Sequence, residues 1–213
     1  MNLLGYIKKY GQYDFRQKPF NTVDATICIT LAYLNFELYL KESDSIIIKD
    51  IPDDLIVPLC AGEFTTIQNR KLVRLLRISK RFQNGVVRYV RSVRDKETTT
   101  QFFALTLFLP HVDPIICFRG TDLTLIGWKE DLMMILNDAV LAHIEARDYV
   151  NDIYHKINSH FLIGGHSKGG NLALYSSVNC DINAQNDIIN IYNLDGPGFR
   201  NALFFYKRKV FAH

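Results

Sequence analysis

The segment from Phe161 to Leu174, which reads Phe-Leu-Ile-Gly-Gly-His-Ser-Lys-Gly-Gly-Asn-Leu-Ala-Leu, most constrains how this chain can fold. A short apolar run precedes the pattern Gly165-x-Ser167-x-Gly169, and residues that favour a helix follow it. This order is typical of a nucleophile elbow, in which a serine sits on a sharp turn between a strand and a helix. Glycines suit such a turn because a Cβ would clash where strand and helix meet, and because the backbone angles are unusual. The segment therefore predicts a nucleophilic serine, Ser167, at a strand end.

Two other interpretations of this segment are less consistent with its surroundings. A Gly-x-Ser-x-Gly pattern is short enough to arise by chance, but here a predicted strand comes before it and small residues open the helix after it. A glycine-rich run can also bind phosphate, although a P-loop needs Gly-Lys followed by Ser or Thr at its end. Lys168 precedes the last glycines and Asn171 follows them, so we exclude a P-loop.

The composition is that of an ordinary globular protein. The chain has 213 residues, of which 48% are hydrophobic and 22% are charged, and this length favours one large domain. A net charge of +3 is too small to indicate a nucleic-acid partner. No run approaches the roughly 18 apolar residues of a membrane span, and the N-terminus lacks the order of a signal peptide. We therefore expect a cytoplasmic protein without stable membrane insertion.

The four cysteines are widely spaced and lie mostly among apolar neighbours. They are Cys28, Cys60, Cys117 and Cys180, and they form no Cys-x-x-Cys pair. This pattern predicts buried, reduced thiols rather than a disulfide framework or a zinc site. No histidine has a metal-ligand spacing with a carboxylate or a cysteine, so we expect neither a metal nor a cofactor.

Hydrophobic periodicity separates a helical N-terminal part from a sheet-forming part. Helices are predicted at residues 21–40 (with Asn21 or Thr22 as the cap), 66–82, 124–137, 141–158 and 168–178, and strands at 86–93, 102–109, 115–118, 161–164 and 188–194. Because strands alternate with helices from residue 115 onward, we predict an α/β fold with a mostly parallel sheet and flanking helices. We predict one domain, 1–213, comprising a mostly helical part (1–84), a sheet core (85–199) and an atypical tail (200–213).

The predicted helix 66–82 has an apolar side and a basic side. Its basic residues are Arg70, Lys71, Arg74, Arg77, Lys80 and Arg81. A basic amphipathic helix can contact anionic lipid. Basic stripes are also common on the solvated faces of helices in soluble proteins, and we favour that interpretation.

A second motif, Cys-Phe-Arg-Gly-Thr-Asp at residues 117–122, follows the third predicted strand. Its backbone N–H groups would lie at a carboxyl end of the sheet, and an oxyanion hole needs two such donors. One donor would be the N–H of Lys168, the residue after the serine. The other would come from Thr121, whose hydroxyl could also contribute. A helix cap formed by Thr121, Asp122 or Thr124 is the alternative interpretation.

Four sequence blocks follow one another along the chain: Phe118 to Thr121, Gly127 to Leu132, Gly165 to Ala173, and Asn193 to Phe199. Together they resemble the Mbeg1-like family of bacterial α/β-hydrolases, and two of them, Phe-Arg-Gly-Thr and Gly-His-Ser-x-Gly-Gly, are more distantly similar to class 3 lipases. The opening, at Tyr13 to Phe15 and Pro19 to Asp24, also resembles the start of the Mbeg1-like family. The resemblance covers nearly the whole chain up to Phe199. It implies Ser167 as the nucleophile and Thr121 in the oxyanion hole, and it implies little about the substrate.

The acid and the base of a catalytic triad should follow the nucleophile, because α/β-hydrolases order these residues as Ser, Asp or Glu, and His. The resemblance implies that both follow the Asp-Gly-Pro-Gly-Phe block, yet only 14 residues come after Phe199. We therefore expect a truncated chain with an incomplete α/β-hydrolase fold. Asp195 lies on the correct side of the sheet for an acid, although a role in the Gly-Pro-Gly turn is the alternative that we favour.

The histidines provide no base in the expected order. His213 is the only histidine after Ser167, and a terminal residue is a poor candidate for an ordered site. His166 adjoins the serine, but in an elbow its side chain should point away from the hydroxyl. The others precede the nucleophile and would break the order: His111, His143, His155 and His160.

Two hypotheses about function follow. The first is a serine hydrolase that cleaves small-molecule or lipid esters through an acyl-enzyme on Ser167. The second is a non-catalytic remnant or a binding protein, because a serine hydroxyl is a weak nucleophile without a histidine to take its proton. The sequence does not predict an oligomeric state.

Overall fold

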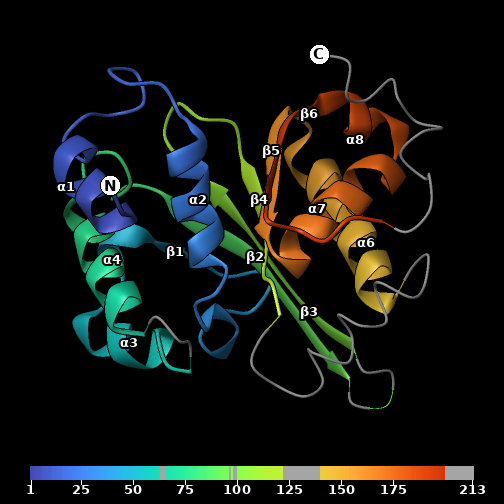
Figure 1. Cartoon of the computed structure of the whole chain (residues 1–213), viewed down its shortest axis with the longest axis horizontal. Coiled ribbons are helices and arrows are strands. Elements are labelled where there is room, and N and C mark those ends of the chain that lie inside the picture. Colours follow the sequence, from blue (N-terminus) through green and yellow to red (C-terminus); the bar gives the residue numbers. More distant parts are fainter. Residues whose placement is uncertain (63–65, 96, 98–99, 122–139, 200–213) are drawn as a thin grey trace. The chain divides into compact units, whose positions relative to one another are not determined.

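The computed structural model describes residues 1–62, 66–95, 97, 100–121 and 140–199 (Figure 1). Its helices are α1 (Leu3–Tyr10), α2 (Thr22–Leu31), α3 (Asp53–Leu59), α4 (Thr66–Ile78), α6 (Leu141–Ile157), α7 (Lys168–Asn179) and α8 (Ile182–Asp187), with 3-10 turns η1 (Phe36–Leu38) and η2 (Ile48–Asp50). Its strands are β1 (Ser45–Ile47), β2 (Val86–Asp95), β3 (Thr100–Phe108), β4 (Ile115–Phe118), β5 (Phe161–His166) and β6 (Ile188–Leu194). The chain divides into two compact units, residues 1–90 with 105–115 and residues 91–104 with those from 116 onward.

The strands form one sheet in the order β1-β2-β3-β4-β5-β6. β1 runs antiparallel to β2, with Ser45 opposite Arg88, and β5 runs parallel to β6, with His166 opposite Leu194. The predicted α/β class is confirmed, but the prediction of a mostly parallel sheet is wrong, because most of the strand pairs are antiparallel. The short connections explain this. β2 and β3 are joined by residues 96–99, whereas a parallel neighbour requires a crossover of a dozen or more residues.

Several predicted elements have the bounds that the sequence indicates. The strands at 115–118 and 188–194 are β4 and β6, the strand at 161–164 is extended to His166 in β5, and the helix at 141–158 is α6. The predicted helix 124–137 lies outside the described residues. In the second unit, α7 contacts α6, β5 and β6 (Figure 1). Among the described residues, no helix is long and apolar enough to cross a membrane.

The helix predicted at residues 21–40 ends earlier than its apolar pattern suggests. α2 begins after Asn21, whose side chain accepts hydrogen bonds from the N–H groups of Val23 and Asp24, while the Asp24 carboxylate accepts one from the Asn21 N–H. This reciprocal arrangement is a capping box and satisfies N–H groups that have no partner within the helix. α2 ends at Leu31, and η1 follows it.

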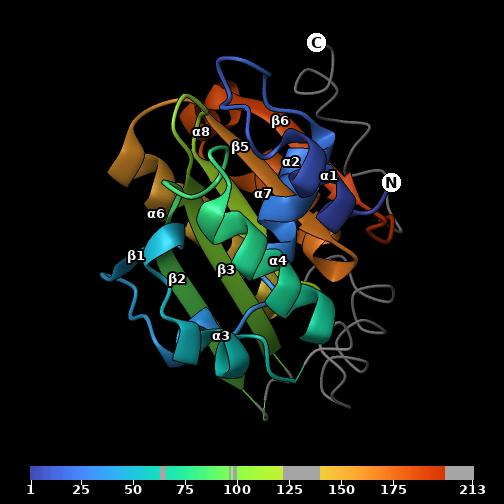
Figure 2. The same ribbon diagram turned by 90° about the vertical axis from the view of Figure 1, so that its left-hand side faces the viewer.

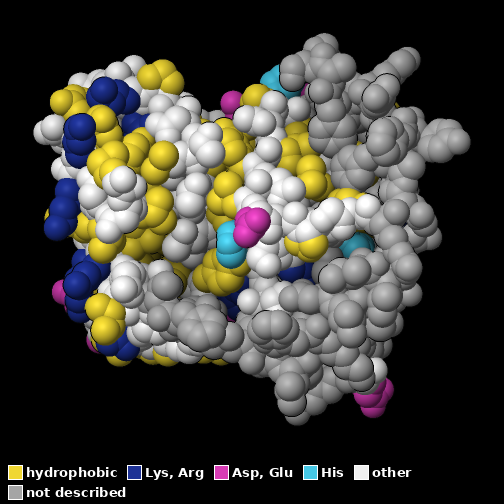
Figure 3. Space-filling model, in the orientation of Figure 1, with side chains coloured by type: hydrophobic (Ala, Val, Ile, Leu, Met, Phe, Trp, Pro, Cys, Tyr) yellow, Lys and Arg dark blue, Asp and Glu magenta, His cyan; other side chains and the backbone are white. Residues whose placement is uncertain are grey.

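The basic helix is shorter than predicted, and this changes the role of one arginine. α4 ends at Ile78 and contacts α1, and the two helices lie side by side in Figure 2. Lys71, Arg74 and Lys80 are exposed, and Figure 3 shows Lys and Arg side chains in dark blue along the margin where Figure 1 places α1 and α4. Arg81 does not belong to this basic face. It lies beyond the helix and is only 1% exposed.

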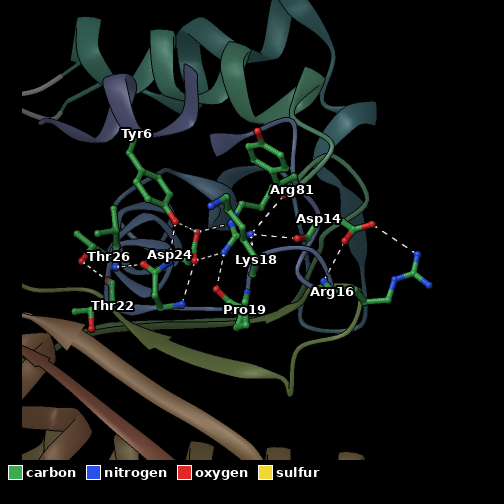
Figure 4. Close-up of polar contacts among 12 residues, drawn as sticks. Tyr6, Asp14, Arg16, Lys18, Pro19, Thr22, Asp24, Thr26 and Arg81 are labelled. Carbon is green, nitrogen blue, oxygen red and sulfur yellow. Dashed lines mark hydrogen bonds and ion pairs between the residues drawn. The ribbon is translucent and has the colours of Figure 1, made fainter. Parts of the chain in front are cut away.

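Arg81 forms the polar centre of the N-terminal unit (Figure 4). Its Nε donates to Asp24 Oδ1 at 2.7 Å, and its Nη2 donates to Asp24 Oδ2 at 2.5 Å. Its Nη1 and Nη2 also donate to the carbonyls of Lys18 (2.7 Å) and Pro19 (3.0 Å). The guanidinium lies 4.1 Å from the centroid of the Phe15 ring. Through these hydrogen bonds the buried Arg81 guanidinium links the segment between α1 and α2 to the residues that follow α4.

The prediction of buried cysteines is confirmed, because all four cysteines are buried and none of them forms a disulfide. Burial raises the pKa of the Cys60 thiol to about 11, and complete burial also raises the pKa of Cys117. At pH 8 a thiol with such a pKa is ionised in about one molecule in a thousand, and the thiolate is the reactive species. We expect the native protein to react with Ellman's reagent at least about 100-fold more slowly than the protein unfolded in urea. Rapid modification of native Cys60 or Cys117 would contradict this placement.

Candidate nucleophile site

Ser167 joins the end of β5 to the start of α7. It is the N-cap of α7, and its φ of 54° and ψ of −127° lie in a region that residues other than glycine seldom occupy. A strained backbone at this position is characteristic of a nucleophile elbow, where the turn pushes the serine side chain out at the strand end. The structure thus contains the predicted strand, sharp turn and helix in succession, and Ser167 is half-buried at the turn.

Three glycines allow the elbow to form, and each one permits a different close approach. A Cβ on Gly165 would lie 2.2 Å from the carbonyl carbon and oxygen of Gly169, where β5 meets α7. A Cβ on Gly169 would lie 2.4 Å from the Phe118 carbonyl oxygen, at the end of β4. A Cβ on Gly170 would lie 2.2 Å from Asn193 Oδ1, near the end of β6. The first turn of α7 therefore packs directly against the ends of three strands.

The contact of Gly169 with β4 brings the elbow helix to the Phe-Arg-Gly-Thr segment. Arg119 is buried, its N–H donates to the Phe103 carbonyl at 3.1 Å, and its guanidinium lies 3.6 Å from the centroid of the Phe103 ring. These contacts fix the backbone two residues before Thr121, which is half-buried. The predicted oxyanion segment thus begins where α7 touches β4.

Lys168, the other predicted oxyanion residue, is the first residue of α7. Its side chain is buried, and its Nζ donates to the Gln101 carbonyl at 2.7 Å. The Lys168 side chain is therefore held against β3 and away from solvent. Backbone N–H groups at a helix start point out of its N-terminus, which carries a partial positive charge. The position of Lys168 is therefore suited to stabilising a developing negative charge through its backbone.

Asp195 stands beside Ser167 because of the register of β5 and β6. His166, the last residue of β5, is paired with Leu194, the last residue of β6, and Ser167 and Asp195 are the residues that follow these two strand ends. The Ser167 N–H donates to the Leu194 carbonyl at 2.9 Å, and Asp195, like Ser167, has a left-handed backbone, with φ of 56°. Neighbouring strands lie about 4.8 Å apart. The structure therefore brings the backbone of Asp195, an exposed residue, close to the backbone of Ser167.

Two polar residues for which the sequence predicted no role at this site connect it to α6. His143 is 1% exposed, and its Nε2 lies 2.7 Å from Oδ1 of Asn171, which is equally buried. The Asn171 Nδ2 donates to the Pro197 carbonyl at 2.9 Å. The signal for His143 was available in the sequence, since it shares the apolar face of its helix with Ala146, Val150 and Ile153. A histidine within an apolar stripe is buried and needs polar partners.

A model of the Mbeg1-like family matches residues 76–211, which are more than half of the chain. The chain belongs to the Mbeg1-like family. The match includes Ser167, Thr121, Lys168 and Asp195, whereas the opening at residues 13–24, which resembles the start of this family, precedes the matched residues. Neither the comparison with curated proteins nor that with solved structures returned a match.

Of the remaining histidines of this Mbeg1-like chain, His155 and His160 lie beside carboxylates and His166 directly precedes Ser167. His155 and His160 lie within 3.3 and 3.2 Å of carboxylate oxygens of Asp181 and Asp187, and both imidazoles are largely exposed. His166 is exposed at the end of β5. His213 falls outside the described residues, as does Asp122, one of the alternative helix caps.

Proposed function

We propose that this Mbeg1-like chain is a serine hydrolase of the α/β-hydrolase class that cleaves carboxylic esters through an acyl-enzyme on Ser167. The observation that carries the proposal is the backbone of Ser167, held in a left-handed conformation between β5 and α7 by close contacts at Gly165, Gly169 and Gly170. Holding a serine in such a strained position costs about 1–3 kcal/mol. A role for the hydroxyl explains why this geometry is present.

The reaction would proceed by attack of Ser167 Oγ on the ester carbonyl carbon. The hydroxyl proton passes to a general base and then to the departing alcohol, and water releases the acid from the acyl-enzyme. The negative oxygen of the intermediate would be stabilised by the N–H of Lys168 and by Thr121, which lies on the segment that α7 contacts. Asp195 is our candidate for the acid, because it follows Leu194, whose carbonyl accepts the Ser167 N–H where β5 and β6 end. Lipid acyl esters are the substrate class that we would test first.

Labelling with a fluorophosphonate probe tests this proposal, since the probe bonds covalently to an activated serine and loses fluoride. We expect labelling of the wild-type chain and its complete loss in Ser167→Ala, because only the elbow serine is activated. Ser159→Ala is the matched control, since Ser159 is an exposed serine two residues before β5. It should be labelled like the wild type. A labelled Ser167→Ala variant, or mass spectrometry that locates the probe on another residue, would refute the assignment.

A non-catalytic binding protein is the second candidate function. The observation that favours it concerns His143, which uses one ring nitrogen on the Val140 N–H and the other on Asn171. This histidine is therefore engaged in structure and is not available to Ser167. Turnover of p-nitrophenyl esters separates the two candidates, because a binding protein would show neither turnover nor probe labelling and would behave like Ser167→Ala.

A further inference from the structure

A buried chain of hydrogen bonds runs from α6 through α7 to the turn after β6. We propose that His143 is a positioning residue that acts through Asn171 to hold residues 195–198, the Asp195 loop, against the Ser167 elbow, and that protonation of His143 releases this loop. The catalytic consequence rests on the proposed function of Ser167. The structural consequence does not, and the two are measured separately below.

The partners of His143 define which ring nitrogen carries the proton. The Val140 N–H donates to Nδ1 at 3.0 Å, so Nδ1 must be unprotonated. In a neutral imidazole the other nitrogen then carries the hydrogen, and Nε2 donates to Asn171 Oδ1 at 2.7 Å. His143 is therefore neutral in this arrangement, and its ring is held at both ends.

His143 in turn determines which way the Asn171 amide faces. With Oδ1 accepting from His143, Nδ2 faces the Pro197 carbonyl and donates to it at 2.9 Å. If the amide were reversed, a donor would face the His143 N–H and an acceptor would face the Pro197 carbonyl. Both hydrogen bonds would be lost in a buried site, where an unpaired polar group is costly. Binding of the Pro197 carbonyl thus depends on the donor at Nε2.

The loop that Pro197 anchors is packed closely on the elbow helix. A Cβ on Gly196 would lie 2.4 Å from Asn193 Oδ1 and 2.7 Å from the backbone nitrogen of Asn171. The Gly196 N–H also donates to Asn193 Oδ1 at 2.9 Å. Gly196 directly follows Asp195, and Asp195 follows Leu194, whose carbonyl accepts the Ser167 N–H. Loosening the contact of Asn171 with the Pro197 carbonyl should therefore displace Asp195 from its position near Ser167.

The surroundings of His143 disfavour its charged form. Its ring stacks on Tyr175 at a centroid distance of 4.2 Å and lies 6.0 Å from the ring of Phe199. Burial lowers the pKa of His143 below its usual value, the hydrogen bond to Asn171 opposes this, and the nearby Lys168 ammonium lowers the pKa further. In the described part of the chain, Lys168 and Tyr175 are the charged or titratable groups of α7 that face the imidazole.

Protonation would place a hydrogen on Nδ1, directly opposite the Val140 N–H. Two N–H donors cannot face each other at hydrogen-bond distance, so the imidazole ring must leave its position, and its hydrogen bond to Asn171 is then broken. Because the folded protein holds the neutral form, the stability from this group is complete above a pH of about 6.5, the ordinary histidine pKa. It decreases as the pH falls below that value, where the unfolded chain binds the proton more readily than the folded chain.

Hydrogen–deuterium exchange of the peptide spanning residues 193–199, corrected for intrinsic exchange at each pH, tests the proposal without any assay of activity. In the wild type we expect protection at pH 7.5 and its progressive loss towards pH 5. His143→Leu removes the donor and should speed exchange about tenfold at pH 7.5, as for one lost hydrogen bond, and its exchange should approach that of the wild type towards pH 5. His143→Gln retains an amide donor but cannot titrate, so protection should persist at pH 5. His155→Gln, an exposed histidine of the same helix, should match the wild type.

Two results would overturn the proposal: wild-type protection of this peptide in His143→Leu, or an unchanged pH dependence in His143→Gln. If His143→Leu does not fold, as judged by circular dichroism, the pH comparison with His143→Gln decides alone. The catalytic consequence is measured by the rate of fluorophosphonate labelling of Ser167. In the wild type this rate should fall at acid pH. In His143→Gln the rate should fall less, because the contribution of His143 protonation is absent. Absence of any labelling would count against the proposed function only, since the exchange result stands independently.

Discussion

Replacing Arg81 by methionine is expected to lower the free energy of unfolding by about 3–5 kcal/mol, because the variant leaves Asp24 charged and buried without its partner. Both side chains of this pair are completely inaccessible to solvent. The Tyr6 hydroxyl, 3.1 Å from Asp24 Oδ1, cannot replace a cation. Urea denaturation followed by circular dichroism measures the loss, which for a chain of this size corresponds to a fall in Tm of about 10 °C.

A nearby arginine provides the matched control. Arg77 also pairs with an aspartate, but Asp53 is 85% exposed, and exposed ion pairs contribute no more than about 1 kcal/mol. Arg77→Met should therefore change stability far less than Arg81→Met. The double variant Arg81→Met with Asp24→Leu removes both charges and should recover part of the stability lost in Arg81→Met; the rest stays lost because Asp24 also accepts the Asn21 N–H at the start of α2. Equal losses of stability in Arg77→Met and Arg81→Met would show that burial of the Arg81–Asp24 pair does not cause the large effect expected for Arg81→Met.

Gly165→Ala is expected to disrupt the elbow, because its Cβ would lie 2.2 Å from two backbone atoms of Gly169. Backbone cannot yield as a flexible side chain does, so the first turn of α7 must move away from β5. We expect a loss of stability of about 3 kcal/mol. If Ser167 is the nucleophile, its labelling rate should also fall by about 100-fold, since a displacement of about 1 Å is enough for that.

Gly198→Ala is the control for Gly165→Ala. Gly198 lies in the Asp195 loop, and a Cβ placed on it would meet nothing within 4 Å. Its unfolding midpoint and labelling rate should therefore equal those of the wild type. A Gly165→Ala variant that unfolds and labels like Gly198→Ala would show that strand and helix are not closely packed at the elbow.

The sequence alone was sufficient for the features that depend on neighbours in the chain. The elbow was predictable because a tight turn between strand and helix tolerates only glycine at particular spacings around the serine. The strands at 115–118 and 188–194 were predictable because short apolar runs between turn residues have few alternatives. The Asn21 cap followed from the same local chemistry, in which a short polar side chain satisfies the first N–H groups of a helix.

The tertiary structure alone decided where individual polar residues lie. By its spacing Arg81 belongs to a basic stripe, yet it is buried, because α4 ends at Ile78 and Asp24 is brought to it from 57 positions earlier in the chain. The bond between His143 and Asn171 and the placement of Asp195 beside Ser167 depend on how α6, α7 and β6 assemble. Local periodicity reports which face of an element is apolar, but it contains no information about which distant group will satisfy a buried charge or donor. That pairing is determined only when the elements pack together.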